Sequence, residues 1–279
     1  PDLVVTYTIK PNIYGGIVCR FLNISYSGNI TGLGTAFQQN GFLKKMVVLM
    51  YKNAFKKVKT VFFENAENRD VFVNERIVAR EKTCILAGAG VNLERFTLEK
   101  YPIGDTTKFL FMGRVMKEKG INELFRAMKM LVDENLNVHL DVLGGFEEEY
   151  QSIIEEGEEQ GWLTYHGYQS DVKPFIKESH CFVLPSWHEG MANTNLECAA
   201  SGRPVITSNI HGCLEAVVDG KTGYLVERKN SDDLYRVMKT FVELPYAERK
   251  MMGIEGRKHM KEQFDKNTVV TKTINKLLR

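Results

Sequence analysis

From residue 108 onward, short apolar segments alternate with segments of helical length. Six apolar segments have strand length: 108–113, 137–145, 162–167, 181–186, 204–208 and 223–226. The amphipathic segment 121–134 and the acidic segment 147–161 lie between the first three of them. Strands that alternate with helix-length connections form a parallel sheet covered on both faces. The pattern therefore predicts a doubly wound, Rossmann-like α/β domain, in which ligands bind outside the carboxyl ends of the strands.

The segments on either side of this region have a different organisation. The tail is helical in composition over 231–242, 246–263 and 267–278, and the oxygens of Ser231, Asp232 and Asp233 suit the N-cap region of the first segment. Residues 1–87 carry fewer strand–helix units, with strands expected over 3–9, 24–30, 58–65 and 83–87 and one helix over 43–59. Gly88 and Gly90 then mark a hinge or linker between two halves.

The chain has 279 residues, enough for two domains with buried cores. Lys and Arg number 37 against 35 Asp and Glu, a balance that gives no support to nucleic-acid binding. The five scattered cysteines favour reduced core residues in a cytosolic protein. No apolar run is long enough to span a membrane, and no signal peptide opens the chain. Its first residues look like an interior strand, so we expect a truncated start.

The segment 43–59 combines an apolar stripe with many lysines. The stripe contains Leu43, Met46, Val47, Met50, Ala54 and Val58, and six lysines lie elsewhere on the helix. We favour a solvated lysine face over a core stripe, because such helices are common on soluble domains. The alternative is a surface helix that rests on an anionic membrane.

Several familiar motifs are incomplete. The segment ITGLGTAF has Phe37 where a dinucleotide fingerprint needs a small residue, and there is no phosphate-binding P-loop. His188 and Glu189 begin a zinc motif whose second histidine is absent. The lack of any Asp-x-Asp pair counts against a divalent metal site, and the six histidines offer no catalytic triad. We therefore expect neither a metal nor a redox cofactor.

Two cations follow the first strand of the regular region. Arg114 comes directly after the strand that ends at Gly113, and Lys119 lies just before Gly120, which opens a helix. A guanidinium fork and a point charge together suit a diphosphate. Because both cations lie at a strand end beside glycines, we favour a ligand role over exposed surface charges.

The segment HEGMANTNLECAASG (188–202) joins another strand end to a helix that begins near residue 192 or 193. The free amides around Met191–Thr194 can bind an anion, and Glu189 can accept hydrogen bonds from hydroxyls. Glu197 suits the diol of a ribose. Its apolar neighbours predict a buried helix, where an unpaired carboxylate is costly. Diphosphate, ribose and sugar together indicate a nucleotide sugar.

These residues resemble the retaining family-4 glycosyltransferases of GT-B fold. The similar segments are FMGRVMKEKG (111–120), 166–206 with its two glutamates eight positions apart, HGCLEAVVDGKTGYLV (211–226) and the linker-like AGAGVNLERF (87–96). TYTIKPNIYGG (6–16) and NITGLGTAF (29–37) further resemble members that build bacterial capsular and O-antigen chains. The family's usual glycine-bearing stretch is replaced here by EGMAN, and a histidine often found in its first-domain loop is not evident.

The resemblance implies a role for each matching residue. Arg114 and Lys119 would bind the donor diphosphate and stabilise the departing nucleotide, and Glu189 would contact the transferred sugar. Glu197 would hold the ribose hydroxyls, and the segment around Tyr168 and Gln169 would lie beside the base. The remaining donor-binding candidates are Gly113 and the backbone of Met191, Ala192 and Asn193.

The resemblance also implies an architecture of two Rossmann-like domains with parallel sheets. Residues 1–90 would be the remainder of an incomplete N-terminal, acceptor-side domain, 91–264 the nucleotide-sugar domain, and 265–279 a terminal helix that packs back on the first domain. The chain would then be the C-terminal portion of a longer enzyme, with little turnover by itself.

The implied reaction moves a hexose-type sugar, with retention, from a nucleoside diphosphate sugar to a lipid-linked saccharide. A UDP-sugar is the favoured donor. We expect a cytoplasmic enzyme that binds no nucleic acid; peripheral contact with the inner face of the bacterial plasma membrane through 43–59 is the alternative to a solvated lysine face. Two alternatives stay open: a sugar-nucleotide epimerase on the same scaffold, and a non-catalytic fragment that binds nucleotide sugars.

Overall fold

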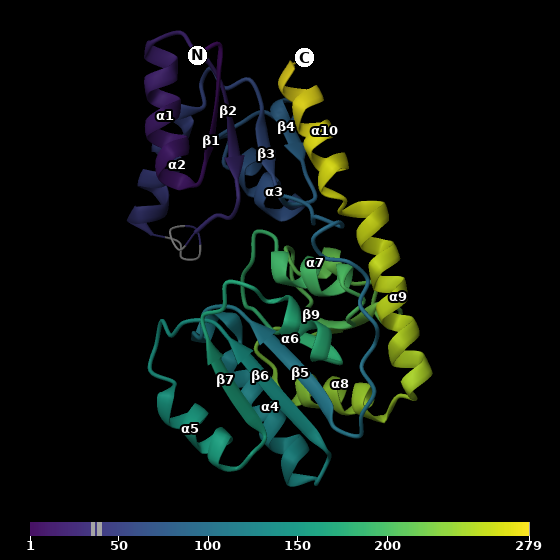
Figure 1. The fold of residues 1–279 in the computed structure, drawn as a ribbon. Helices are drawn as coiled ribbons and strands as arrows, with labels where there is room; N and C mark the ends of the chain where they lie inside the picture. The colour runs from purple at the N-terminus through teal and green to yellow at the C-terminus, as the bar shows by residue number, and fades with distance from the viewer. Residues whose placement is uncertain (35–36, 38–40, 279) are drawn as a thin grey trace. The chain divides into compact units, whose positions relative to one another are not determined.

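The computed structural model describes residues 1–34, 37 and 41–278. Two compact units make up the chain, and each contains one parallel sheet (Figure 1). Unit 1 comprises Pro1–Gly90 and Lys266–Arg279, and unit 2 comprises Val91–Asp265. Residues 35–36 of the segment NITGLGTAF and the last residue of the expected terminal helix lie outside the described residues.

Unit 2 is built on a six-stranded parallel sheet of order β10-β9-β8-β5-β6-β7. The doubly wound α/β fold expected from the sequence is therefore confirmed. The strands are β5 (Thr107–Met112), β6 (Val138–Leu143), β7 (Leu163–Gly167), β8 (Cys181–Leu184), β9 (Val205–Ser208) and β10 (Gly223–Val226). Each of them overlaps an apolar segment of the sequence, and β8 and β9 are buried along their whole length.

The helices of unit 2 pack on this sheet in pairs: α4 lies against α8, and α7 lies against α9. Their bounds are α4 (Ile121–Asp133), α5 (Gln151–Glu159), α6 (Lys173–Glu178), α7 (Asn193–Ala200), α8 (Ser231–Glu243) and α9 (Tyr246–Gln263), with short 3-10 turns η3 (Lys117–Lys119) and η4 (Leu214–Ala216). The expected N-cap at Ser231–Asp233 is wrong by one residue. Asn230 caps α8, because its side-chain oxygen accepts from the amides of Asp232 and Asp233.

A buried guanidinium joins distant segments of unit 2. Arg203 is fully buried and donates to the carbonyl oxygens of Ile176 (2.7 Å), Lys100 (2.9 Å) and Lys177 (3.0 Å). Its ring neighbour is Tyr101, which lies 5.6 Å away. Carbonyl groups thus satisfy a buried cation that forms no ion pair with a carboxylate among the described residues, and they fix the segment before β5 to the end of α6.

Unit 1 is a four-stranded parallel sheet of order β1-β2-β3-β4 with helices packed on it. The elements are β1 (Leu3–Tyr7), α1 (Ile9–Phe21), β2 (Ser25–Ile30), α2 (Phe42–Ala54), β3 (Val61–Phe63), α3 (Ala66–Asn74), the 3-10 turn η2 (Arg80–Lys82), β4 (Thr83–Ile85) and α10 (Lys266–Leu278). The sequence analysis expected only one helix in the first 87 residues. It missed α1, whose sequence contains a proline and two glycines, and α3, which is largely polar.

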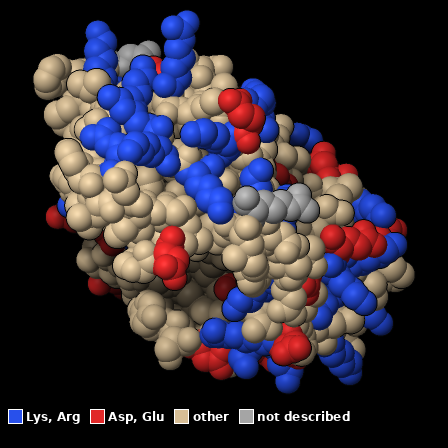
Figure 2. All heavy atoms as spheres, turned by 90° about the horizontal axis from the view of Figure 1, so that it is seen from above, with Lys and Arg blue, Asp and Glu red and all other residues tan. Residues whose placement is uncertain are grey.

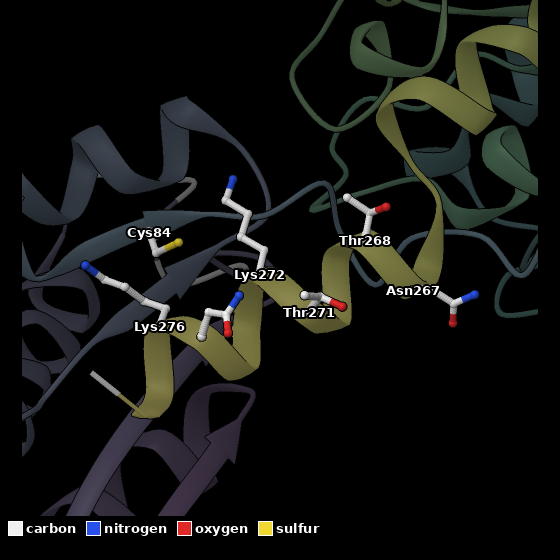
Figure 3. A pocket seen from close by; sticks show the side chains of 7 residues that line it. Cys84, Asn267, Thr268, Thr271, Lys272 and Lys276 are labelled. Atoms are coloured by element: carbon white, nitrogen blue, oxygen red, sulfur yellow. The ribbon is translucent and has the colours of Figure 1, made fainter.

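The helix α10 belongs to unit 1 and lies beside β4 (Figure 1). The Lys272 ammonium donates to the carbonyl oxygen of Ile85 (2.8 Å), and Lys59 donates to that of Leu277 (2.7 Å). A pocket of about 600 Å³ lies along this contact, and Lys272 and Lys276 point toward the strand that carries Cys84 (Figure 3). The pocket contains none of the residues singled out from the sequence. Cys84 is half-buried, unlike the four buried cysteines.

The expected apolar stripe of α2 is partly wrong. The residues that face the core are Val47, Val48, Tyr51 and Ala54, whereas Leu43 and Met46 are exposed. Phe42 and Leu49 are also exposed, at 83% and 68%. Because 3.6 residues complete a helical turn, Phe42, Met46 and Leu49 form a second apolar stripe on the side away from the core. The helix is therefore apolar on two sides.

Candidate functional site

Two of the predicted site residues meet in unit 2, although they are 70 positions apart in the sequence. The Lys119 ammonium donates to Oε1 of Glu189 at 2.5 Å, and the Ser186 hydroxyl donates to the same oxygen at 2.8 Å. The side chains of Lys119 and Glu189 are 19% and 13% exposed. A largely buried ion pair thus occupies the carboxyl ends of β5 and β8, the end of a parallel sheet where ligands bind.

Close backbone packing brings the two residues together. A Cβ at Gly120 would lie 2.0 Å from the carbonyl oxygen of Pro185, so only glycine allows this approach. The Trp187 amide also donates to the carbonyl oxygen of Glu118 at 2.8 Å. The loop that carries Lys119 is therefore fixed against the loop that carries Glu189.

A third loop closes on the same place. A Cβ at Gly212 would lie 2.6 Å from the carbonyl oxygen of Glu189, and Gly212 has a φ of 92°. The Glu215 carboxylate holds this loop, because it accepts from the Gly212 amide (2.7 Å) and contacts Nδ1 of His211 (2.8 Å). Burial and the negative charge of nearby Glu189 raise the pKa of the Cys213 thiol. Residues 211–215 thus form one wall of the site.

The contact with this loop corrects one expectation from the sequence. The amide of Ala192 is not free, because it donates to the carbonyl oxygen of Gly212 at 2.7 Å. The side chains of Met191 and Ala192 are buried, and that of Asn193 is exposed. The helix α7 begins at Asn193, as expected, without a side-chain cap. Its first amides, rather than that of Ala192, remain suited to an anion.

Glu197 lies inside α7 among buried neighbours, as the sequence predicted. Leu196, Cys198 and Ala199 are at most 1% exposed. Burial raises the pKa of the Glu197 carboxyl, and the opposing influence of Arg95 is smaller. No hydrogen bond or ion pair of this carboxylate is found in the described part of the chain. A half-buried carboxylate without a partner is costly, and a ligand with hydroxyl donors would offset the cost.

Arg114 takes a different partner from Lys119. Its guanidinium forms an ion pair with Glu147 at 3.8 Å, and both side chains are more than half exposed. The Gly113 amide is bonded within the sheet to the carbonyl oxygen of Leu143 (2.9 Å). Within the described residues, no direct contact joins Arg114 to Lys119 or Glu189. Arg114 therefore lies at the end of β5 as a solvated cation, available to a ligand.

Tyr168 and Gln169 follow β7 at the same end of the sheet. Tyr168 is 82% exposed, and the Gln169 amide donates to the carbonyl oxygen of His166 at 2.6 Å. Phe146 and Tyr165 form an aromatic pair nearby in the sequence, with ring centroids 4.7 Å apart. The expected base-binding segment thus presents a polar loop and an exposed aromatic ring.

Three residues of the site had no role in the sequence analysis: Ser186, Gly212 and Glu215. Ser186 directly follows the apolar core of a strand, and polar residues at strand ends are the signal that identified Arg114. Gly212 and Glu215 lie in HGCLEAVVDGKTGYLV, a segment recognised as similar to a family without an assignment of roles. The contact of Gly212 with Glu189 and Ala192, and the bond from the Gly212 amide to Glu215, depend on how the loops pack, which spacing does not reveal.

Among the described residues, no group of three or more His, Cys, Asp and Glu side chains is placed to hold a metal ion. In the same residues, no helix has the length and apolar character needed to cross a membrane.

The fold and the site define a class of protein. Two units with parallel sheets are the arrangement of the GT-B glycosyltransferases to which the chain is similar in structure. The structure of HepE from Anabaena in complex with UDP and glucose superposes with a TM-score of 0.83 at 16% identity, covering 99% of this chain and 78% of that one. The chain matches the family described as "Glycosyl transferases group 1" over residues 94–259, and it belongs to that family.

Two curated relatives are similar over most of the chain. One is the N,N'-diacetylbacillosaminyl-diphospho-undecaprenol alpha-1,3-N-acetylgalactosaminyltransferase of Campylobacter jejuni, at 26% identity over 84% of this chain and 65% of its own length. The other is the capsular polysaccharide biosynthesis glycosyltransferase CapM of Staphylococcus aureus, at 27% identity over 82% of this chain and 64% of its own length. The chain thus spans slightly less than two thirds of either relative.

Proposed function

We propose that the protein transfers a hexose-type sugar from a nucleoside diphosphate sugar to a lipid-linked saccharide in bacterial surface polysaccharide synthesis. The observation that carries the proposal is the Lys119–Glu189 ion pair, together with the start of α7, which Gly212 joins to the Glu189 loop. One turn inside α7 lies Glu197, whose carboxylate has no hydrogen bond or ion pair among the described residues. Cations suit a diphosphate, and carboxylates suit the hydroxyls of sugar and ribose. The relative from Campylobacter jejuni, named for a diphospho-undecaprenol substrate, supports a lipid-linked acceptor.

Each group has a task in this proposal. Lys119, Arg114 and the first amides of α7 would stabilise the charge that develops on the departing diphosphate, a kind of electrostatic assistance that often dominates catalysis. Glu189 would accept from hydroxyls of the transferred sugar, and Glu197 from the ribose diol. Tyr168 would lie beside the base. With fixed cations in these places, we propose that the reaction needs no metal ion.

We further propose a UDP-sugar as donor and retention at the anomeric carbon. The UDP and glucose bound to HepE support a uridine nucleotide. Retention rests on the family resemblance, and attack from the same face as the departing diphosphate fits a site without a convincing covalent nucleophile.

Calorimetric titration with UDP, GDP and ADP tests the donor site. UDP should bind most tightly, and Glu197→Ala should weaken its binding by at least about tenfold, because a lost charged hydrogen bond costs about 1.5–3 kcal/mol. Ser201→Ala is a matched control, because Ser201 lies one turn after Glu197, at the C-cap of α7. Unchanged UDP affinity in Glu197→Ala would remove that residue from the site.

A product assay without acceptor separates a transferase from an epimerase. Binding without turnover in the full-length protein would indicate a non-catalytic role.

We also propose that unit 1 contacts an anionic membrane surface through α2. The second apolar stripe of α2 would enter the lipid interface, and Lys45 and Lys52 lie along its side by helical spacing. The helix α1 packs beside α2 and has its own exposed apolar residues, Tyr14, Val18 and Phe21. This contact would bring a lipid-linked acceptor to the protein.

The charge of unit 1 supports the same surface. The unit contains 16 Lys and Arg residues and 6 Asp and Glu residues. In the view of Figure 2, Lys and Arg side chains gather in the upper left with few acidic side chains between them. Anionic lipids attract each nearby cation by about 1 kcal/mol, and buried apolar side chains add to this attraction.

Sedimentation with phosphatidylglycerol vesicles tests this surface. Leu49→Ser should weaken vesicle binding about tenfold, since burying one such side chain contributes about 1.5–3 kcal/mol. Ile103→Ser is a matched control, because Ile103 is 77% exposed in unit 2. Equal losses in the two variants, or equal binding to neutral vesicles, would contradict the proposal.

A further inference from the structure

The ion pair at the donor site is arranged unequally around one carboxylate. Lys119 Nζ and Ser186 Oγ both donate to Oε1 of Glu189, at 2.5 and 2.8 Å. Ser186 is fully buried. Neither of these two donors engages Oε2, so within the described residues this oxygen is the one suited to a ligand hydroxyl. Glu189 thus has one oxygen committed to the protein.

The Lys119 ammonium is already paired with Glu189 before any ligand binds. Lys119 is 19% exposed and Glu189 is 13% exposed, so water screens their attraction little. Breaking a buried pair leaves an uncompensated charge, which is strongly unfavourable. A diphosphate that approaches Lys119 must therefore share the cation with Glu189 or displace it.

The cost of this competition differs between two ligands. A free nucleoside diphosphate brings negative charge to Lys119 and offers no hydroxyl at the position of the missing sugar, so Glu189 faces an anion without a new donor. A nucleotide sugar brings the same diphosphate together with sugar hydroxyls that can donate to Oε2. Hydrogen bonds from these hydroxyls to Glu189 offset the attraction to Lys119 that Glu189 loses when the diphosphate binds.

We propose that Glu189 is an internal counter-ion of Lys119 that weakens the retention of the product nucleoside diphosphate relative to the intact donor. The inference rests on the proposed function, since it takes Lys119 as a ligand of the diphosphate. Glu189 then has two tasks on two oxygens: Oε1 restrains Lys119, and Oε2 recognises the sugar. The site favours exchange of spent nucleotide for fresh donor.

The chain offers an internal control of equal charge. Arg114 and Glu147 form the other ion pair at this edge of the sheet, but their atoms are 3.8 Å apart and their side chains are 59% and 52% exposed. Solvent screens such a pair, and its contribution is small. Loss of the Glu147 charge should therefore change nucleotide affinity far less than loss of the Glu189 charge.

The experiment measures calorimetric binding of UDP, GDP and ADP to wild type, Glu189→Gln and Glu147→Gln. Glu189→Gln should bind the nucleotide about tenfold more tightly than wild type does, as expected for release of a close charge pair. The affinity of Glu147→Gln should stay within about twofold of the wild-type value. In a Lys119→Met background, adding Glu189→Gln should give no such gain. Thermal melting of each variant with and without the nucleotide reports folding and provides a second measure of binding.

The outcomes separate the two proposals. If wild type binds none of the three nucleotides, the proposed function fails and this inference fails with it. If wild type binds one of them and Glu189→Gln binds it no more tightly, or if the gain persists without Lys119, the counter-ion role alone is overturned.

Discussion

Unit 1 carries 16 Lys and Arg residues against 6 Asp and Glu, whereas unit 2 carries 21 against 29, although the whole chain has a formal net charge of only +2. The two units also differ in where charged and apolar side chains lie. Unit 2 buries charged groups such as Arg203 and the Lys119–Glu189 pair and satisfies them internally. Unit 1 exposes apolar residues along one side of a helix, Phe42, Met46 and Leu49 of α2. The contrast is the one expected if, as we propose, unit 2 binds a small polar ligand and unit 1 contacts an external surface.

The largest expected effect concerns the buried cation of unit 2. Arg203→Met should lower the free energy of unfolding by about 3–5 kcal/mol, because several carbonyl oxygens lose their donor in the interior. Urea unfolding measures the change. Arg126→Met is the control, since Arg126 is 66% exposed and pairs with Asp232 on the surface. A loss below 1 kcal/mol in Arg203→Met would show that the interior of unit 2 does not depend on this residue.

A pH effect should follow from His180 in the same unit. Burial, with smaller contributions from Arg249, Arg203 and Lys108, lowers the pKa of His180 to about 4. The backbone amide of Lys108 also donates to its Nδ1 at 3.1 Å, which requires an unprotonated nitrogen. The unfolded chain binds this proton at higher pH than the folded chain. The contribution to stability is therefore complete above the unfolded value, and it declines as pH falls from about 6.5 to about 4, by up to about 3 kcal/mol.

Unfolding measured between pH 7 and pH 4 tests this expectation. His180→Asn keeps an acceptor for the Lys108 amide but cannot be protonated, so its stability should fall less steeply over that range. Parallel slopes for the variant and wild type would contradict the assignment.

The third prediction compares two neighbours on α2. Val48 is 7% exposed and Leu49 is 68% exposed. Val48→Ala should cost about 1–3 kcal/mol of stability through the cavity it leaves, and Leu49→Ala less than about 0.5 kcal/mol. Thermal and urea unfolding measure both variants. If Leu49→Ala were as costly as Val48→Ala, the outward stripe of α2 would be part of a core and could not be an external surface.

The smallest effect should come from the solvated Arg114–Glu147 pair at the end of β5. Glu147→Gln should change the free energy of unfolding by no more than about 0.5 kcal/mol, because its partner Arg114 is well exposed. Urea unfolding of Glu147→Gln and Glu189→Gln compares the two pairs. Glu189→Gln should lose more stability, since it leaves Lys119 without its buried partner. Similar losses in the two variants would show that burial does not distinguish these pairs.

The sequence predicted unit 2 better than unit 1. Continuous apolar segments mark buried parallel strands, so all six strands of unit 2 were found in their places. In unit 1, α1 contains Pro11, Gly15 and Gly16, residues that are unfavourable inside helices, so the sequence did not predict this helix. Gly16 allows α1 to pack closely against Ala54. The stripe of α2 was misjudged for another reason. Two apolar faces on one helix give no single periodic signal, and only packing decides which of them is buried.

The sequence by itself determined the α/β class, the positions of the strand ends, and the candidate residues Arg114, Lys119, Glu189 and Glu197, because periodicity and position along the chain suffice for these. Tertiary structure decided which of them meet. Lys119 pairs with Glu189 while Arg114 takes Glu147, and the amide of Ala192 is used by Gly212. Such contacts join loops from different strands, and they depend on close backbone approach at Gly120 and Gly212, which linear spacing does not encode.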